Sequence, residues 1–394
     1  MMPSDATSPA QTRPLPKWFE LLLFAFAVAN LVWLITAVLT GSWLWDETGR
    51  YLSTDFLNVY AAGKFALQGA PVSAYDWPTH KQLEIQILGY DFNGYYGWHY
   101  PPFYLFVAAA LAMLPYAAAQ AVWPAITFVP FAAAVRASAS SNTGFLLALS
   151  APALVANAIV GQNGFLTAAL IGLVLVLLPK RPVLAGICLG LLTYKPHFGI
   201  LFPVALIAAG HWRAFIAAGV TALVLAFASI AAYGFEPWLA FAHWLPVTSQ
   251  TFLSEGQAEI QKMQSLFAVV RTLGGEEWIA WSAQILLSSA IALLVWKVWR
   301  SARYAYETKA ALLGAGVLLA TPYIYLYDMV TITIPAAFLF ALGFRRYEFA
   351  GLAAIMLFIA AFPFVKLPVG FIASLLLMAL IMRRLFAPSS RAAE

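Results

Sequence analysis

The chain has 394 residues, of which 62% are hydrophobic and 10% are charged, and its mean hydropathy is +0.80. A soluble core does not need so much apolar sequence, so the composition excludes an ordinary soluble domain and predicts a polytopic membrane protein. The net charge of +5 comes from short basic clusters between apolar runs, a pattern that orients helices, and we exclude a nucleic-acid partner. The single cysteine, Cys188, excludes an internal disulfide and a thiolate metal site.

The chain begins with a short polar tail, residues 1–17, which carries Arg13 and Lys17. The apolar run that follows, from Phe19 to Thr40, is longer than the apolar core of a signal peptide. We therefore expect an uncleaved first span that enters the membrane from the cytoplasm.

Further apolar runs predict an all-α bundle of about 11–13 transmembrane or half-spanning helices, because a full crossing takes about 20 residues. The predicted helices cover residues 18–40, 100–115, 117–135, 143–160, 163–178, 183–194, 196–209, 212–232, 278–299, 308–322, 329–343, 347–363 and 368–386. We expect them to form a single integral membrane domain, residues 18–386, between cytoplasmic tails at 1–17 and 387–394.

Basic residues mark alternate ends of these helices and predict the orientation of the chain. The clusters at 297–303, 345–346 and 383–391 indicate cytoplasmic ends, so both termini are predicted to be cytoplasmic. The two long polar loops, 41–99 and 233–277, then face outward and carry interfacial helices.

Two stretches do not fit a simple alternation of full spans. Residues 100–135 must cross an odd number of times if Arg136 is cytoplasmic, yet the Leu114-Pro115 break suggests a hairpin. Either one half does not span fully, or Arg136 lies outside. The segments 183–194 and 196–209 are each roughly 20 Å long, short of about 30 Å of hydrocarbon. Broken half-helices of this kind surround a protein-lined or watery cavity.

The first outer loop contains Asp55 and Asn58 on one side of a short helix that ends near Gly69. We expect this helix, and a second one after Trp77-Pro78, to lie flat on the bilayer. Asp55 is either a first-turn acid that complements the helix dipole or part of a site.

The same loop ends with His99 and Tyr100, just before the prolines that begin the next apolar run. These two residues either anchor the chain at the membrane interface or contact the substrate.

Two polar breaks interrupt the following apolar runs. Gln162 and Asn163 lie in a GQNG segment, which is either a simple turn or a place where amides donate to sugar hydroxyls. Lys195 and His197 lie in TYKPHFG at membrane depth, where a charge needs a cavity or a partner. Lys195 is therefore a candidate ligand of an anionic group such as phosphate, the alternative being that it snorkels to the interface.

The second outer loop predicts an interfacial helix around Trp238 and a short helix from Gln264 to Gly275. Arg271 either caps that short helix or recognises phosphate. Further on, the segment TPYIYLYD includes Tyr323 and ends at Asp328. These two residues either belong to an aromatic belt with one water-facing acid or contact the substrate.

Several familiar signatures do not occur in the sequence: a glycine-rich phosphate loop, HExxH, paired cysteines and a GxSxG elbow. An enzyme that works outside the cell has no nucleotide supply. We therefore expect an activated sugar to arrive on a lipid carrier.

The order of short motifs along the chain resembles bacterial glycosyltransferase family 87, formerly a domain of unknown function. The motifs are DFLNVYAAGKFALQG, YPPFYLF with Leu114, Pro115 and Trp123 downstream, GQNG, YKPH, QSLFAVVR and TPY. The resemblance covers about residues 20–345. It implies a C-type glycosyltransferase-like bundle and a sugar donor attached to a polyprenyl phosphate.

The resemblance also implies roles for individual residues. Asp55 matches the essential loop aspartate, the general base, and Lys195, Gln264 and Ser265 match positions near the donor. The chain departs from the mannosyltransferases of the family in its late outer segment, where Asp328 stands and they have a histidine. This departure puts a histidine-dependent role, and mannose as the sugar, in question.

The resemblance implies an inverting hexosyltransferase, with mannose as the first candidate sugar, in a bacterial cytoplasmic membrane. Its partners would be a polyprenyl-phosphate sugar, a lipid or glycan acceptor and membrane lipids, and we expect neither a cofactor nor a metal. The rivals are a transporter or lipid-linked sugar flippase, and a lipid-linked polymerase or ligase. The chain shows no internal repeat, a feature that many transporters have.

Overall fold

The structure is a computed structural model that describes residues 15–94, 96–249, 260–365 and 367–386. Within these ranges the chain is helical and forms no strand, and its extended pairing is limited to two isolated bridges, Trp45 with Tyr51 and Met263 with Tyr325. The predicted tails at 1–17 and 387–394 lie almost entirely outside the described residues. The all-α class predicted from the apolar runs is confirmed.

The α-helices in chain order are α1 Lys17–Thr40, α2 Phe56–Leu67, α3 Trp77–Leu88, α4 Leu105–Ala112, α5 Tyr116–Ala139, α6 Thr143–Leu149, α7 Leu154–Val160, α8 Gly164–Leu177, α9 Pro182–Leu191, α10 Pro196–Gly199, α11 Leu201–Ala208, α12 Trp212–Tyr233, α13 Glu236–Ser249, α14 Leu266–Thr272, α15 Glu277–Arg300, α16 Tyr306–Ala320, α17 Thr333–Ala341, α18 Arg346–Ala360, α19 Phe362–Val365 and α20 Val369–Leu385. Short 3₁₀ helices join them: η1 Pro71–Ala74, η2 Pro102–Tyr104, η3 Leu192–Tyr194, η5 Ile260–Lys262 and η6 Leu326–Ile332.

In the part of the chain that the structure describes, four helices are long and apolar enough to cross a membrane: α1, α5, α12 and α15. The pair α6 and α7, bent by 58°, makes a fifth if it is counted as one span. The chain is therefore a polytopic membrane protein. The other predicted spans form shorter helices, so most of the expected bundle consists of partial spans.

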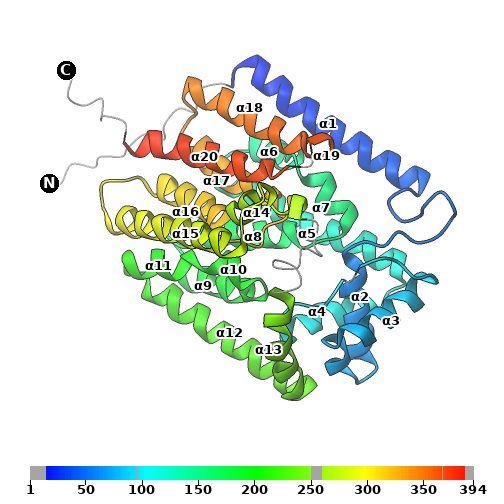
Figure 1. The fold of residues 1–394 in the computed structure, drawn as a ribbon. Helices are drawn as coiled ribbons and strands as arrows, with labels where there is room; N and C mark the ends of the chain where they lie inside the picture. Colours follow the sequence, from blue (N-terminus) through cyan, green and yellow to red (C-terminus); the bar gives the residue numbers. More distant parts are fainter. Residues whose placement is uncertain (1–14, 95, 250–259, 366, 387–394) are drawn as a thin grey trace, which may run out of the picture.

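The interior of the bundle is centred on α16, whose side chains from Ala310 to Ala320 are all buried. The helices α15, α17 and α20 pack around it (Figure 1). By contrast, only 17% of the apolar window of α1 and 11% of that of α12 are buried within the protein. These two helices present long apolar surfaces that only lipid can cover, which supports insertion in a membrane.

The short helix α4 resolves the conflict over residues 100–135. With η2 it runs from Pro102 to Ala112, which corresponds to roughly 16 Å of helix and is too short to cross about 30 Å of hydrocarbon. The helix α5 is long enough to cross alone. Of the two alternatives from the sequence, the structure thus favours the one in which half of this stretch does not span.

The structure corrects the expectation that the helix after Asp55 lies flat on the bilayer. Nearly every side chain of α2, from Phe56 to Phe65, is buried, on both sides of the helix. The helix packs between α3 and α4 instead of exposing a polar face. It is an internal element of the first outer loop, because its small and apolar residues suit close packing all round.

The second predicted interfacial helix, α3, is present, and the face that it buries includes polar side chains. Asp76 caps it by accepting from the Thr79 amide at 3.2 Å, and the turn-spaced residues Trp77, His80 and Glu84 are buried. Leu83 and Ile87, the apolar residues that predicted an interfacial helix here, are half-buried. Packing within the loop therefore decided which side of α3 faces inward.

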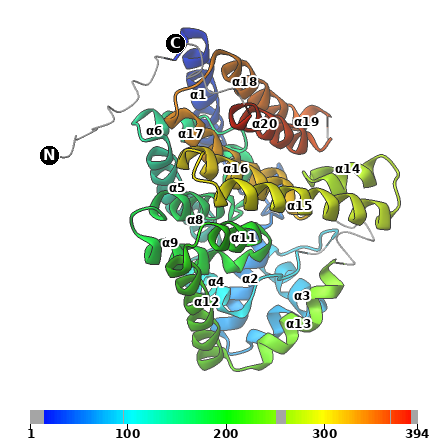
Figure 2. The same ribbon diagram turned by 90° about the vertical axis from the view of Figure 1, so that its left-hand side faces the viewer.

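The two outer loops pack against each other. Trp244 of α13 stacks on Trp77 at 5.5 Å between ring centroids, and Phe241 contacts Tyr75 at 6.2 Å. Figure 2 shows α13 beside α3 at the end of the molecule that also holds α2. The helix α13 of the second loop thus packs directly on the first loop, at Tyr75 and Trp77.

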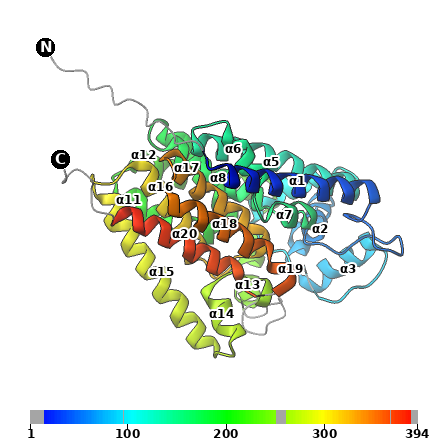
Figure 3. The ribbon, with the colours of Figure 1, turned by 90° about the horizontal axis from the view of Figure 1, so that it is seen from above.

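The opposite end of the molecule carries basic helix ends. The last turns of α15 and α20, which contain Arg300 and Arg384, point there (Figure 1). The helices α18 and α20 run alongside each other (Figure 3) and are tied by a buried ion pair between Arg384 and Glu348. The fold therefore separates a basic end from the end that holds α2, α3 and α13.

Candidate functional site

Asp55 lies at the start of α2, but its side chain does not cap that helix. The half-buried carboxylate instead accepts a hydrogen bond from the Gln162 amide, at 2.9 Å from Nε2 to Oδ2. This contact joins residues 107 positions apart in the chain. Asp55 is thus directed towards the rest of the bundle and not towards the N–H groups of its own helix.

The GQNG segment brings Gln162 to Asp55 through a tight turn between α7 and α8. Gly161 has φ of +68°, and a Cβ at this position would come within 2.7 Å of Phe56, the residue after Asp55. A Cβ on Gly164 would meet the Tyr327 carbonyl oxygen at 2.6 Å. Both glycines are required because backbone and neighbouring elements meet here without room for a side chain.

Asn157 fixes the shape of this turn. Its Oδ1 accepts from the Gly164 amide at 2.8 Å, and its carbonyl accepts from the Gly161 and Gln162 amides. The turn that the sequence predicted is confirmed, and it is anchored from inside α7 by a polar side chain that the sequence analysis overlooked. The only available signal was an asparagine within an otherwise apolar run.

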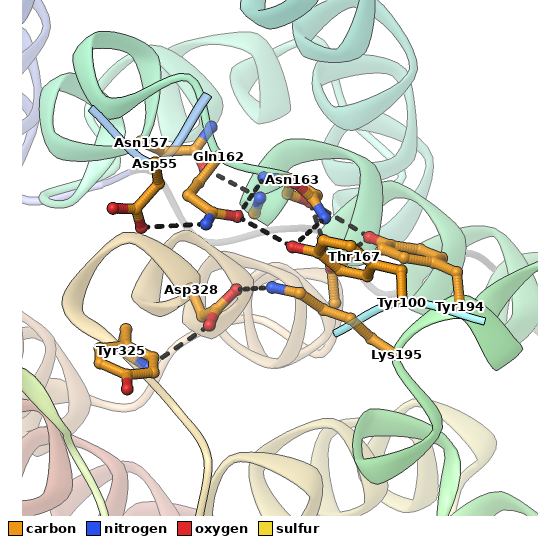
Figure 4. A network of polar contacts seen from close by, with 11 residues as sticks. Asp55, Tyr100, Asn157, Gln162, Asn163, Thr167, Tyr194, Lys195, Tyr325 and Asp328 are labelled. Atoms are coloured by element: carbon orange, nitrogen blue, oxygen red, sulfur yellow. Dashed lines mark hydrogen bonds and ion pairs between the residues drawn. The ribbon is translucent and has the colours of Figure 1, made fainter. Parts of the chain in front are cut away.

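A chain of amide and phenol groups continues from Gln162 into the bundle (Figure 4). Tyr100 donates to Gln162 Oε1 at 3.4 Å and accepts from Asn163 Nδ2 at 2.9 Å. Next to it, the hydroxyls of Thr167 and Tyr194 lie 2.6 Å apart. Tyr100, Gln162 and Asn163, all predicted as substrate contacts, are therefore brought together with Asp55.

Lys195 and Asp328 form a buried ion pair beside this network. The Lys195 ammonium lies 2.8 Å from Asp328 Oδ1, and both side chains are almost fully buried. Lys195 comes from the break between η3 and α10, and Asp328 comes from the first turn of η6, which runs directly into α17. Lys195 does not snorkel to an interface. The Asp328 carboxylate balances its charge inside the protein.

The environment of Asp55 makes it a stronger base than an exposed aspartate. Burial raises the pKa of Asp55, and the Gln162 hydrogen bond and the charges of Lys262 and Lys195 only partly offset this effect. The phenol of Tyr327 also stabilises the charged form. A carboxylate with a raised pKa next to polar groups from distant helices has the properties of a general base.

Asn58 and His99 have mainly structural surroundings. Asn58 is buried and donates to the Gly97 carbonyl at 3.4 Å, so it holds the segment that leads to Tyr100. His99 packs edge-on against Trp77, with 5.7 Å between ring centroids, and burial lowers its pKa to about 3. Both residues lie close to the network in the chain, and their described contacts serve to position the end of the first outer loop.

The remaining predicted residues gather on the second outer loop and the segment around Tyr323. Ser265 caps α14 by accepting from the Ala268 amide, at 3.2 Å from Oγ, and Arg271 donates to the Gly275 carbonyl at 3.0 Å beyond the helix end. Tyr323 lies against the buried cluster around Met263, and His197 faces it at 6.2 Å between ring centroids. The Ser265 hydroxyl and one guanidinium nitrogen of Arg271 are therefore occupied by hydrogen bonds at the two ends of α14.

Two residues near Asp55 were not predicted from the sequence. Tyr327 and Lys262, the latter exposed, both favour the charged form of Asp55 and so lower its pKa. Tyr327 lies directly before Asp328 in a tyrosine-rich segment, and Lys262 lies two residues before the QSLFAVVR motif. Both were therefore adjacent to recognised motifs but had no pattern of their own.

A metal site is not indicated by the described ranges, in which no three His, Cys, Asp or Glu side chains converge. The groups that the structure brings together are two carboxylates, three amides, several phenols and two lysines. Such a set can accept a proton, donate to hydroxyls and attract an anion.

Comparison with known proteins gives one finding. The model of glycosyltransferase family 87 matches residues 98–322, more than half of the chain. The match includes Tyr100, the GQNG turn and Lys195, whereas Asp55 and Asp328 lie outside it. No curated protein and no solved structure matches the chain.

Proposed function

Because the chain belongs to glycosyltransferase family 87, we propose that this membrane glycosyltransferase transfers a hexose, with mannose as the first candidate, from a polyprenyl-phosphate donor. The acceptor is a lipid or glycan alcohol. The reaction takes place on the extracytoplasmic side of a bacterial cytoplasmic membrane and inverts the anomeric configuration. The transporter and flippase alternatives are set aside because the family is one of enzymes.

The observation that carries this proposal is the contact between Asp55 and Gln162. It joins a carboxylate of raised pKa, from an outer loop, to a polar network that reaches into the membrane bundle. An acceptor from the aqueous side and a donor whose carrier lies in the membrane have to meet at such a boundary. The amides of Gln162 and Asn163 are suited to hydrogen bonds with sugar hydroxyls.

In the proposed reaction, the acceptor oxygen attacks the anomeric carbon from the side opposite the phosphate. The bond between that carbon and the phosphate oxygen breaks, and its electron pair leaves with the polyprenyl phosphate. The acceptor proton moves to the Asp55 carboxylate. Because the transition state has oxocarbenium character and a developing phosphate dianion, the site needs one base and nearby positive charge.

The direct test compares the wild-type protein with Asp55→Asn in membranes supplied with labelled polyprenyl-phosphate mannose, arabinose or glucose and with cell-envelope lipids as acceptors. Loss of a general base lowers turnover by about 10²–10⁴-fold. If the wild-type protein uses none of these three donors, the proposed function is contradicted. Undiminished turnover by Asp55→Asn would remove Asp55 from the chemistry.

The stability of Asp55→Asn provides the control for folding. The amide introduced by this substitution retains an acceptor oxygen for the Gln162 hydrogen bond. Since burial raises the pKa of Asp55, the ionised carboxylate destabilises the folded state, and this effect grows as pH rises from the unfolded pKa to the folded one. At neutral pH, Asp55→Asn should therefore unfold at the same temperature as the wild type or at a higher one.

A further inference from the structure

Gln264 fixes a short segment of the second outer loop by hydrogen bonds in three directions. Its backbone amide donates to the Ile324 carbonyl at 2.7 Å, and its side-chain Oε1 accepts from the Gly370 amide at 2.7 Å. Its Nε2 donates to the Lys262 carbonyl at 3.0 Å. Gln264 is fully buried, so these contacts are shielded from water.

The neighbours of Gln264 reinforce this anchorage. Met263 forms a β-bridge with Tyr325, and Met263, Gln264 and Ser265 are all completely buried. Lys262, at the edge of the anchored segment, is exposed. A buried, hydrogen-bonded segment thus ends at an exposed lysine and fixes the backbone of that lysine.

The bridge also places the backbone next to Lys262 beside the segment that carries Tyr325. Tyr325 is followed by Tyr327 and Asp328, which border Asp55 and Lys195 in the site. The charge of Lys262 acts on Asp55 accordingly. Lys195, the other lysine of the site, is held in a buried ion pair with Asp328, so a substrate anion must compete with that carboxylate for its ammonium group.

The proposed reaction makes a particular demand on the site. The donor phosphate is a diester with one negative charge, and the leaving polyprenyl phosphate acquires a second one. A carboxylate such as Asp55 repels this charge unless a cation lies between or beside them. The demand rises during bond cleavage, so a suitable cation accelerates the reaction as well as binding the donor.

We propose that Lys262 binds the phosphate group of the lipid-linked donor and stabilises the leaving phosphate, and that Gln264 is the positioning residue that holds Lys262 by its backbone. The inference rests on the proposed function. It assigns to Gln264 a role different from the direct donor contact that the sequence predicted, because both ends of its amide are bonded within the protein.

The test measures binding of polyprenyl phosphate and of the uncharged polyprenol of the same chain length to the purified protein. The wild type should prefer the phosphate, and Lys262→Ala should lose about 10- to 100-fold of that preference, as expected for one charge-assisted hydrogen bond. Lys262→Arg should recover part of it. Arg50→Ala, which removes an exposed cation of the first outer loop, should leave the preference unchanged.

Kinetics then separate positioning from a general structural effect. Lys262→Ala should raise the KM for the donor and lower kcat, with the KM for the acceptor unchanged, and Gln264→Ala should shift the same constants in the same direction. Gly370→Ala offers a variant on another helix, since its Cβ would lie 3.0 Å from Gln264 Cβ and Oε1. It should weaken phosphate preference without altering any charge.

The outcomes distinguish the two proposals. If the wild type neither uses polyprenyl-phosphate sugars nor prefers polyprenyl phosphate over polyprenol, the proposed function fails and this inference fails with it. If the wild type does both and Lys262→Ala retains the full preference, only the inference is overturned. An equal loss of donor and acceptor binding in Gln264→Ala would show a structural role and exclude positioning.

Discussion

At the scale of single residues, opposing effects set the pKa of Asp55. Burial disfavours its charge, whereas the Gln162 amide, two lysines and the Tyr327 phenol favour it, and burial is the larger effect. The pKa of Asp55 therefore lies above that of an ordinary aspartate. A base must be ionised to work, so kcat/KM should fall as pH decreases through this raised pKa.

Removal of the Gln162 hydrogen bond should move this acidic limb to higher pH. In Gln162→Ala the carboxylate loses a contact that stabilises its charged form, which raises the pKa of Asp55 further. The measurement is the pH dependence of kcat/KM with a saturating acceptor.

Asn163→Ala provides the matched control for this pH profile. Its amide donates to Tyr100 and not to Asp55. Whatever the effect of Asn163→Ala on the rate, the acidic limb of the pH profile should lie at the same pH as in the wild type. A limb that moves to lower pH in Gln162→Ala would contradict this account of Asp55.

A helix break and the first turn of a 3₁₀ helix supply the charged pair at the centre of the site. The break at Lys195 predicted from TYKPHFG is confirmed, with η3 before Lys195 and α10 after it. The segment at η6 is a 3₁₀ helix in which Asp328 accepts from the Tyr325 amide. Breaks and 3₁₀ segments of this kind allow polar backbone and charged side chains at membrane depth because protein surrounds them.

The coupling between Lys195 and Asp328 can be measured by a double-mutant cycle. Either Lys195→Met or Asp328→Asn leaves one buried charge without its partner, which destabilises a protein by about 3–5 kcal/mol. The double variant buries no such charge, so its loss should be smaller than the sum of the two single losses. Thermal unfolding in detergent measures the loss of stability in each single variant and in the double variant.

The exposed ion pair between Arg50 and Asp46 is the control for this cycle. Its arginine side chain is 55% exposed, so Arg50→Ala, which leaves the Thr48 hydrogen bonds to Asp46 in place, should barely change the unfolding temperature. Strictly additive losses for Lys195→Met and Asp328→Asn would contradict coupling between these two residues.

On the scale of the whole molecule, the helix lengths and the packing of the loops support one orientation. Only α5 is long enough to cross within residues 100–139, which permits Arg136 to share a side with the basic ends of α15 and α20. The helices α2 and α3 of the first loop lie at the other end (Figure 1), and α13 of the second loop packs on η1 beside them. We therefore expect the site to face the extracytoplasmic side.

Cysteine labelling in intact cells tests this orientation. In a Cys188→Ala background, Ser42→Cys lies in the first outer loop and Ala302→Cys in the turn between α15 and α16, and neither position is buried. A membrane-impermeant maleimide should label the first in intact cells and the second only after permeabilisation. The reverse pattern would place the proposed site in the cytoplasm.

The sequence by itself determined that this protein is an all-α membrane protein, where its helices break and which loops carry polar groups. These features depend on local hydropathy, proline and glycine, which act over a few residues. The expected lipid-facing position of α2 was wrong, because local pattern does not reveal which neighbours cover a helix.

Only the tertiary structure decided which polar groups meet. Asp55 contacts Gln162 across 107 positions, and Lys195 contacts Asp328 across 133. It also showed that Gln264 and Ser265 hold the protein together and that Lys262 and Tyr327 approach Asp55. Such pairings depend on how distant helices pack, and a desolvated polar group takes whichever partner that packing provides.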